Sequence, residues 1–289
     1  MVWNYFGKLF LWTINGHQLC VTQSKKKTQT EKTNNNKFEF DWRTHMKTST
    51  KRTLVAAAIS SACLLTAMPS YAEGEFTANA GATSNYIWRG LTQTVNEAAV
   101  QGGIDYAHES GFYAGTWASN VSYASDDIYS YEHDVYFGYS GEADGVAYDF
   151  GYLYYNYDAE AEFDFAEIYG SVGMGGVSVT VYLLAHTEAD EAEGQDFGFG
   201  QAYYASLDYT TEILNGTELT LHAGYHSGDF VDAFNFGDGT DNYADYGVTI
   251  AKDGFSFAVT GTNLDDVGAD ALDNDELKFT VAYSVDFEL

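Results

Sequence analysis

The chain ends in Leu277-Lys278-Phe279-Thr280-Val281-Ala282-Tyr283-Ser284-Val285-Asp286-Phe287-Glu288-Leu289, in which a large apolar side chain occupies every second position. Because successive side chains of a β-strand point to opposite faces of a sheet, this alternation predicts a strand with one apolar and one polar face. The same period of two recurs in residues 146–154 and 217–225. No segment shows a sustained period of 3.6, so the pattern predicts an all-β fold.

Short and long connections alternate between the segments with this period. Turn-like connections such as 109–111 and 252–254 are followed by longer, acidic ones such as 187–198 and 227–242. This is the pattern of an antiparallel transmembrane β-barrel, whose periplasmic turns are short and whose extracellular loops are long. An even strand number would place both chain ends on the periplasmic side. We expect about twelve strands: 75–89, 98–108, 112–123, 129–141, 145–157, 163–173, 176–186, 199–211, 217–226, 243–252, 254–263 and 276–289.

Composition separates residues 73–289 from the part that precedes them. They hold three basic residues against 39 acidic ones, a formal charge of −36, which argues against nucleic acid as a partner. They contain no cysteine and no proline, and a chain of paired strands should avoid proline because it cannot donate to a β-ladder. Their 22 tyrosines and 15 phenylalanines favour a barrel with aromatic girdles in lipid over a water-soluble sandwich or lipocalin-like barrel.

The amino-terminal part reads as an export signal. Met46 is followed by Lys47, Lys51 and Arg52, then by an apolar run, and the small residues around Tyr71 supply a cleavage site. The apolar run, of roughly 15 residues, is shorter than the ~20 that a membrane-spanning helix needs. We therefore expect residues 46–72 to be a signal peptide, residues 73–289 to be the barrel, and residues 1–45 to be an over-extended start or a disordered segment.

Three blocks near the start of the predicted barrel, residues 84–94, 99–108 and 110–121, resemble the TorF-type porin family of proteobacterial outer-membrane proteins, whose members are named by inference. The resemblance rests on Tyr86-x-x-Arg-Gly, Gln101-Gly-Gly and Gly111-x-Tyr-x-Gly-x-Trp in this order. It implies an outer-membrane location and a pore, and it brings no known substrate. The chain departs from the family at Asn85 and Thr92, where members often have Asp and Ser. The final Phe287-Glu288-Leu289 also lacks the terminal Phe that such barrels use as an assembly signal.

If the apolar face of each strand meets lipid, the alternate face lines the lumen. An acidic aqueous lumen should favour cations over anions. Arg89 should pair with carboxylates, either bracing the barrel or defining a constriction. The acidic loops 227–242 and 265–276 lack the spacing of a calcium loop, so no metal site and no cofactor is predicted. The candidates for the lumenal face are Asn79, Arg89, Asp105, Glu132, Asp134, Asp149, Asp208, Glu218, His222, Lys278 and Asp286.

The sequence contains no Gly-x-Ser-x-Gly, His-Glu-x-x-His or phosphate-binding glycine loop. The His–Ser neighbours at 226–227 and 108–110 do not make a dyad by themselves, so no catalytic residue is predicted and the protein is not expected to be an enzyme. The predicted function is passive diffusion of small hydrophilic solutes, cationic or zwitterionic, across the bacterial outer membrane. The alternatives are a plugged structural or surface-contact barrel without a pore and, less favoured, an outer-membrane lipid hydrolase. The expected partners are outer-membrane lipids, small solutes and the barrel assembly machinery, the last through the C-terminal strand.

Overall fold

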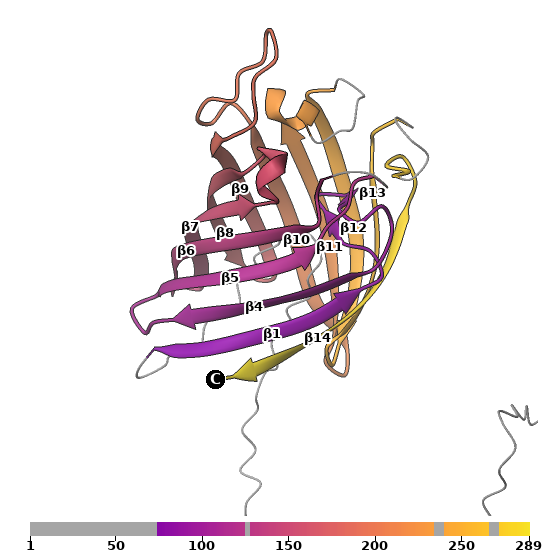
Figure 1. Ribbon diagram of the computed structural model, residues 1–289. Coiled ribbons are helices and arrows are strands. Elements are labelled where there is room, and N and C mark those ends of the chain that lie inside the picture. The colour runs from indigo at the N-terminus through magenta and orange to yellow at the C-terminus, as the bar shows by residue number, and fades with distance from the viewer. Residues whose placement is uncertain (1–73, 125–127, 234–239, 266–271) are drawn as a thin grey trace, which may run out of the picture. The chain divides into compact units, whose positions relative to one another are not determined.

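The computed structural model describes residues 74–124, 128–233, 240–265 and 272–289. Twelve antiparallel strands close a barrel in chain order, and the first, β1 (Glu75–Thr83), pairs with the last, β14 (Lys278–Glu288) (Figure 1). The predicted barrel is thus confirmed, whereas the predicted segments 1–45 and 46–72 lie outside the described residues. The other wall strands are β4 (Ala99–Ala107), β5 (Phe112–Asn120), β6 (Tyr131–Ala143), β7 (Val146–Asn156), β8 (Phe165–Met174), β9 (Val177–Thr187), β10 (Tyr203–Leu214), β11 (Thr217–Ser227), β12 (Asn242–Lys252) and β13 (Phe255–Thr262).

One end of the barrel, which we call the short-turn end, has two-residue turns at four of its five connections, and the β4–β5 connection there has four residues. Asp144-Gly145, Gly175-Gly176, Asn215-Gly216 and Asp253-Gly254 join neighbouring strands, and all eight residues have positive φ. Two-residue turns of this kind match the right-handed twist of the strands they join, and Asp, Asn and Gly tolerate the conformation best. The chain therefore fixes the register of four strand pairs locally. The opposite, long-loop end carries the longer connections, including the short helices η1 (Ala159–Ala161) and η2 (Asp229–Ala233).

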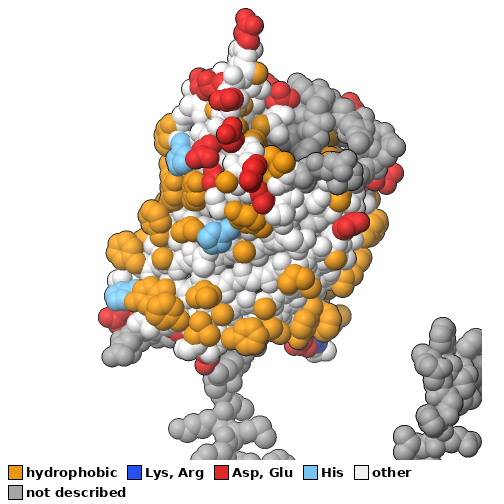
Figure 2. Space-filling model, in the orientation of Figure 1, with side chains coloured by type: hydrophobic (Ala, Val, Ile, Leu, Met, Phe, Trp, Pro, Cys, Tyr) orange, Lys and Arg blue, Asp and Glu red, His pale blue; other side chains and the backbone are white. Residues whose placement is uncertain are grey.

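The outer wall is apolar between two aromatic borders. Figure 2 shows hydrophobic side chains spread over the strands, while acidic side chains gather at the long-loop end. Outward side chains such as Phe137 (57% exposed) and Val248 (43% exposed) would be unfavourable in water but suit contact with lipid. Among the described residues no helix is long and apolar enough to cross a membrane. The exposed aromatics near the short turns are Phe76, Phe112, Tyr139, Phe255 and Tyr283, and those near the long loops are Tyr131, Tyr203, Tyr225 and Tyr246.

Inward tyrosines lie flat over glycines of the neighbouring strand. A Cβ on Gly151 of β7 would lie 2.6 Å from the Cζ and Oη atoms of Tyr169 on β8, so only glycine leaves room for the ring. The same arrangement pairs Tyr136 with Gly115 and Tyr204 with Gly224. Rings held against the wall in this way occupy less of the lumen than rings projecting toward the barrel axis.

The glycine requirement is testable. Gly151→Ala is expected to displace the Tyr169 ring and to destabilise the folded barrel by about 1–3 kcal/mol, as overpacking of a filled site does. Urea unfolding of the refolded protein in lipid measures this change. In a Tyr169→Ala background the same glycine substitution should cost almost nothing, because the two changes share one contact. Equal costs in both backgrounds would contradict the packing.

The largest departure from the predicted strands follows β1. The wall strand was predicted to run to residue 89, but β1 ends at Thr83 and the chain then turns inward. The cause is local: Thr92 donates a hydrogen bond to Asn85 Oδ1 at 2.7 Å, and Asn85 Nδ2 donates to Asn96 Oδ1 at 2.9 Å. Such short polar side chains compete with a strand ladder by binding their own neighbourhood. Residues 90–94, which were predicted to lie in a connection between two wall strands, are therefore buried inside the barrel.

Candidate functional site

Residues 84–98 form what we call the inner hairpin. Its two short strands, β2 (Ile87–Trp88) and β3 (Leu91–Thr92), pair only with each other and form a separate sheet. Arg89 (φ 47°) and Gly90 (φ 82°) make the two-residue turn between them, which places the Arg89 side chain at the tip. The prediction that put Arg89 at the end of the first wall strand is therefore wrong, although its position inside the barrel is as expected.

The Arg89 guanidinium lies in a cage of one carboxylate, one imidazole and three aromatic rings. It is fully buried; its Nη2 lies 2.6 Å from Glu167 Oε2, and its Nη1 lies 3.2 Å from His226 Nε2. Its Cζ lies 4.2 Å from the ring centroid of Trp88, and the centroids of Tyr204 and Tyr182 are at 4.4 and 5.1 Å. An arginine cannot lose its proton in a protein, so this cage stabilises a permanent cation by ion pairing and cation–π contacts.

Further contacts join the hairpin to distant parts of the wall. The Tyr86 hydroxyl donates to Glu132 Oε1 on β6 at 2.7 Å. Trp88 packs edge-on against Tyr155 of β7, with 6.1 Å between the ring centroids. At the tip, a Cβ on Gly90 would lie 2.8 Å from the Cβ of Asp245 on β12. The hairpin starts between β1 and β4 and thus reaches across the lumen to the opposite wall.

At the level of the hairpin, every wall strand contributes a buried inward side chain. The buried set contains apolar, polar and charged groups, and several of them, among them Glu132, Tyr155 and Glu167, contact the hairpin. The hairpin and these buried side chains therefore occupy the long-loop half of the lumen. One member from each strand in turn is Thr83, Gln101, Ser119, Glu132, Tyr155, Glu167, Leu184, Tyr204, His226, Tyr243, Thr262 and Lys278.

The other predicted lumenal residues lie on inward faces at several levels. Asp105 accepts a hydrogen bond from the Tyr136 hydroxyl, and Asp149 accepts one from the Tyr113 hydroxyl at 2.6 Å. Both carboxylates lie in the half of the barrel nearer the short turns. In the same half, Asn79 donates to Asp105 at 3.5 Å, and Glu218 and Asp286 are exposed. Glu132 and Asp134 are buried beside the hairpin, and Lys278 donates to the carbonyl of Leu272.

His222 lies between two aspartates on neighbouring strands. Its Nδ1 is 2.6 Å from Asp208 Oδ1 and its Nε2 is 2.8 Å from Asp245 Oδ1, so a protonated ring donates to both. Tyr204 shares this network, since its hydroxyl is 3.2 Å from Asp245 Oδ1. Tyr204 also covers Arg89, so the network and the guanidinium cage have one residue in common.

Sequence reasoning assigned no lumenal role to Glu167, His226, Tyr182, Tyr204 and Asp245, although it named His226 as the neighbour of a serine. Two of them carried a signal that could have been used: Glu167 and Asp245 are acidic residues on the inward parity of strands that were predicted at 163–173 and 243–252. The convergence of four strands on Arg89 had no such signal, because it depends on where the barrel closes. The pore-lining role of the predicted set remains a prediction and is taken up below.

Outside the cage, His108 and Ser110 lie in contact in the β4–β5 connection. Ser110 Oγ lies 2.7 Å from His108 Nδ1, closer than the sequence suggested. The Ser110 backbone N–H donates to the same ring nitrogen at 3.2 Å, in an exposed turn, as a turn-stabilising histidine does. Among the described residues, no cluster of His, Cys, Asp and Glu is arranged to hold a metal ion; the predicted acidic loops 227–242 and 265–276 lie partly outside them.

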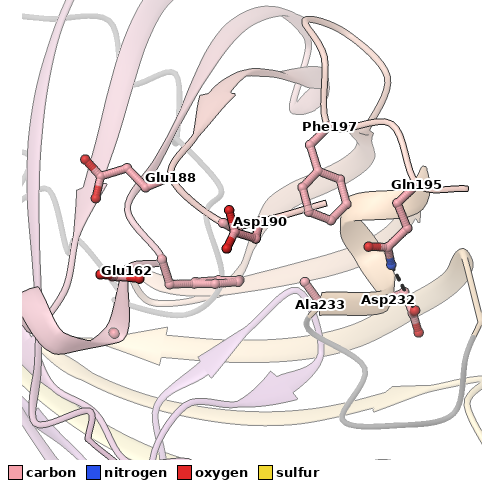
Figure 3. A pocket seen from close by; sticks show the side chains of 10 residues that line it. Glu162, Glu188, Asp190, Gln195, Phe197, Asp232 and Ala233 are labelled. Atoms are coloured by element: carbon pink, nitrogen blue, oxygen red, sulfur yellow. Dashed lines mark hydrogen bonds between the residues drawn. The ribbon is translucent and has the colours of Figure 1, made fainter. Parts of the chain in front are cut away.

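A pocket of about 370 Å³ opens among the long loops (Figure 3). Phe163 and Phe197 contribute apolar surface, and Gln195 donates to Asp232 across one side at 3.3 Å. Its remaining acidic members are Glu162, Glu188 and Asp190. The pocket contains none of the predicted lumenal residues, and it has no residue in common with the Arg89 cage.

A closed antiparallel barrel with an apolar outer band defines the class of the protein, because such barrels cross outer membranes. Residues 68–285 match the model of the Gcw_chp family, described as a bacterial protein of unknown function. The chain belongs to this family, and as a bacterial barrel with a lipid-facing wall it is an outer-membrane protein. None of the curated proteins matches the sequence.

Several solved structures resemble the barrel. The NanC porin is 11% identical, with a TM-score of 0.47, and the match covers 74% of this chain and 100% of that one. The KdgM porin is 9% identical, with a TM-score of 0.44, over 74% of this chain and 99% of that one. The outer membrane protein OprD from Pseudomonas aeruginosa is 14% identical, with a TM-score of 0.38, and the match covers 74% of this chain and 66% of that one. At these identities the likeness concerns the fold alone.

Proposed function

We propose that the protein is a porin-like channel for small hydrophilic cations or zwitterions, closed in this conformer by the inner hairpin. We also propose that it belongs with the TorF-type porins, on the residues of the hairpin and of β4 and β5 that carry that resemblance. The observation that supports a channel is the acidic, partly exposed lumen between the hairpin and the short-turn end. A barrel that served only as a solid anchor would gain nothing from ionisable groups facing inward.

Apart from His222, whose ring lies 2.6 Å from Asp208 Oδ1, the ionisable groups of this lower lumen are acidic. Its inward carboxylates are Asp105, Asp149, Asp208, Glu212, Glu218 and Asp286. The basic residues of the described chain lie elsewhere: Arg89 and Lys278 at the hairpin level, and Lys252 at a turn, where it donates to the carbonyl of Asn215. Walls carrying one sign of charge concentrate the opposite ion and repel the like one. Cations should therefore pass more readily than anions.

The contacts that hold the hairpin also support a hairpin that can leave the lumen and open the channel. It shares no strand ladder with the wall, since β2 and β3 pair only with each other. An isolated bridge joins Thr94 to Ser122 in the β5–β6 connection. Ser84, at the base of the hairpin, donates its backbone N–H to the carbonyl of Val281 on β14 at 2.9 Å. Side-chain contacts hold the rest of the hairpin, and these can open without breaking the barrel. A plugged barrel without a pore is the second candidate, and the buried set on all twelve strands favours it.

Planar-bilayer recording of the refolded protein decides between the two. A channel is expected to show openings whose reversal potential in a KCl gradient indicates cation preference. Absence of current both in the native protein and after removal of the hairpin would overturn the channel and leave the plugged barrel. A preference for chloride would contradict the role assigned to the acidic lumen.

Neutralising two lumenal carboxylates tests the origin of selectivity. The double variant Asp105→Asn/Asp149→Asn should move the reversal potential toward zero, because it removes two of the charges that attract cations. The matched control is Asp144→Asn/Asp253→Asn, which removes the same charge from turn positions where Asn tolerates a positive φ. The control should keep the native reversal potential. Equal shifts in both double variants would show that total charge, rather than lumenal charge, sets selectivity.

A further inference from the structure

The cage around Arg89 is built mostly from the wall and not from the hairpin. Glu167, Tyr182, Tyr204 and His226 belong to β8, β9, β10 and β11, four consecutive strands. Only Trp88 and Arg89 itself come from the hairpin. Each wall residue is fixed by its own strand ladder, so the four remain side by side whether or not the hairpin is present.

Neighbouring groups hold the wall part of the cage in place. The Tyr155 hydroxyl donates to Glu167 Oε2 at 3.1 Å. The Tyr204 hydroxyl lies 3.0 Å from His222 Nε2 as well as next to Asp245. A carboxylate that is 3% exposed and has lost its cation is strongly disfavoured, so the empty site would attract another cation.

The geometry selects the kind of cation. Two different nitrogens of Arg89 are used, Nη2 toward Glu167 and Nη1 toward His226, and the plane of the group is covered by aromatic faces. A planar, delocalised, weakly hydrated guanidinium meets these requirements, whereas a compact, strongly hydrated ammonium meets only the charge requirement. Arg89 Nε has no hydrogen-bond partner among the described residues, so the site does not require a donor at the substituted nitrogen.

We propose that this wall site binds the guanidinium group of a permeating solute, and that Arg89 occupies the site as an internal mimic of that solute. The proposal rests on the proposed channel and names its solute class: small guanidinium compounds. Solute and hairpin then compete for one site, so a guanidinium solute favours the conformer in which Arg89 has left the cage.

Arg89→Ala empties the cage without touching the wall. We expect this variant to conduct more than the native protein, and we expect methylguanidinium at millimolar concentration to block the added current. Methylammonium at the same concentration and ionic strength is the matched control and should block at least about tenfold more weakly. The double variant Arg89→Ala/Glu167→Gln should lose the methylguanidinium block, because the carboxylate that pairs with the cation is gone. A block of equal strength in the double variant would overturn the site.

Binding measured without current separates this proposal from the channel itself. Isothermal titration of methylguanidinium into refolded Arg89→Ala in detergent should show saturable binding. Binding should be weaker in the native protein, where Arg89 competes for the site, and absent in the double variant. Such binding without current in any variant would uphold the site and reject the channel. Current in Arg89→Ala without saturable binding would uphold the channel and reject the guanidinium site. Urea unfolding is the folding control for both experiments: native-like resistance to urea would show that both variants are folded.

Discussion

Replacing residues 86–94 by a flexible Gly-Ser linker of equal length is expected to raise the conductance of the barrel by roughly tenfold or more. The reason is geometric, because the hairpin fills the space between the buried side chains of the twelve wall strands, which the wall side chains alone would not fill. A twelve-stranded barrel is wider than the eight-stranded barrels whose side chains fill the interior. Single-channel recording in a planar bilayer measures the change.

The control for this replacement is a linker of the same composition in residues 188–196, in the β9–β10 connection. These residues lie among the long loops and contain no member of the Arg89 cage. Conductance should stay at the native level there, although the pocket at the long loops is lost. If removing the hairpin leaves a folded barrel with native conductance, the closure lies elsewhere and the role of residues 84–98 as the closing element is refuted.

The second large effect is expected from Glu167→Gln. This substitution leaves the Arg89 guanidinium buried without its counter-charge, and breaking one half of a buried ion pair typically costs about 3–5 kcal/mol. The wall strands keep their ladders, so the cost falls on the docking of the hairpin. Channel openings should become frequent, and the hairpin should become sensitive to proteolysis near Arg89 while the barrel stays folded.

A matched variant separates the ion pair from simple packing. In Arg89→Met/Glu167→Leu both charges are removed together, and apolar replacement of a whole buried pair is often neutral in stability. This double variant should close nearly as well as the native protein in the same recordings. Frequent openings in the double variant, or native closure in Glu167→Gln, would show that the ion pair does not hold the hairpin.

Much of the architecture could be predicted because it depends on short stretches of sequence. Alternation with a period of two marks each wall strand, as in β14, and Asp144-Gly145 and Asn215-Gly216 mark two-residue turns. The inward parity of Asp105, Asp149 and Asp208 follows from the same alternation. Strand count and antiparallel order then follow from short turns alternating with longer connections.

The hairpin could not be predicted by this reasoning. Residues 84–98 contain apolar and polar positions that also suit a wall strand. For this reason the first wall strand was predicted to extend to residue 89. What decides their place is the set of partners across the lumen, Glu132, Glu167 and His226, which are 46 to 137 residues from their hairpin partners. Contacts of that range depend on how the strands are arranged around the barrel, so neither periodicity nor spacing could reveal them.

The pairing of β1 with β14 has a consequence for the order of assembly. Its register joins Thr77 to Glu288, so the wall cannot close until nearly the whole chain has arrived. Pairings between segments far apart in sequence form slowly, so we expect this pairing to be a late step of folding. The inner hairpin follows β1 directly and is therefore synthesised among the first segments of the barrel. A curved, still open sheet can fold around it, so the last strand pairing encloses a hairpin that is already in place.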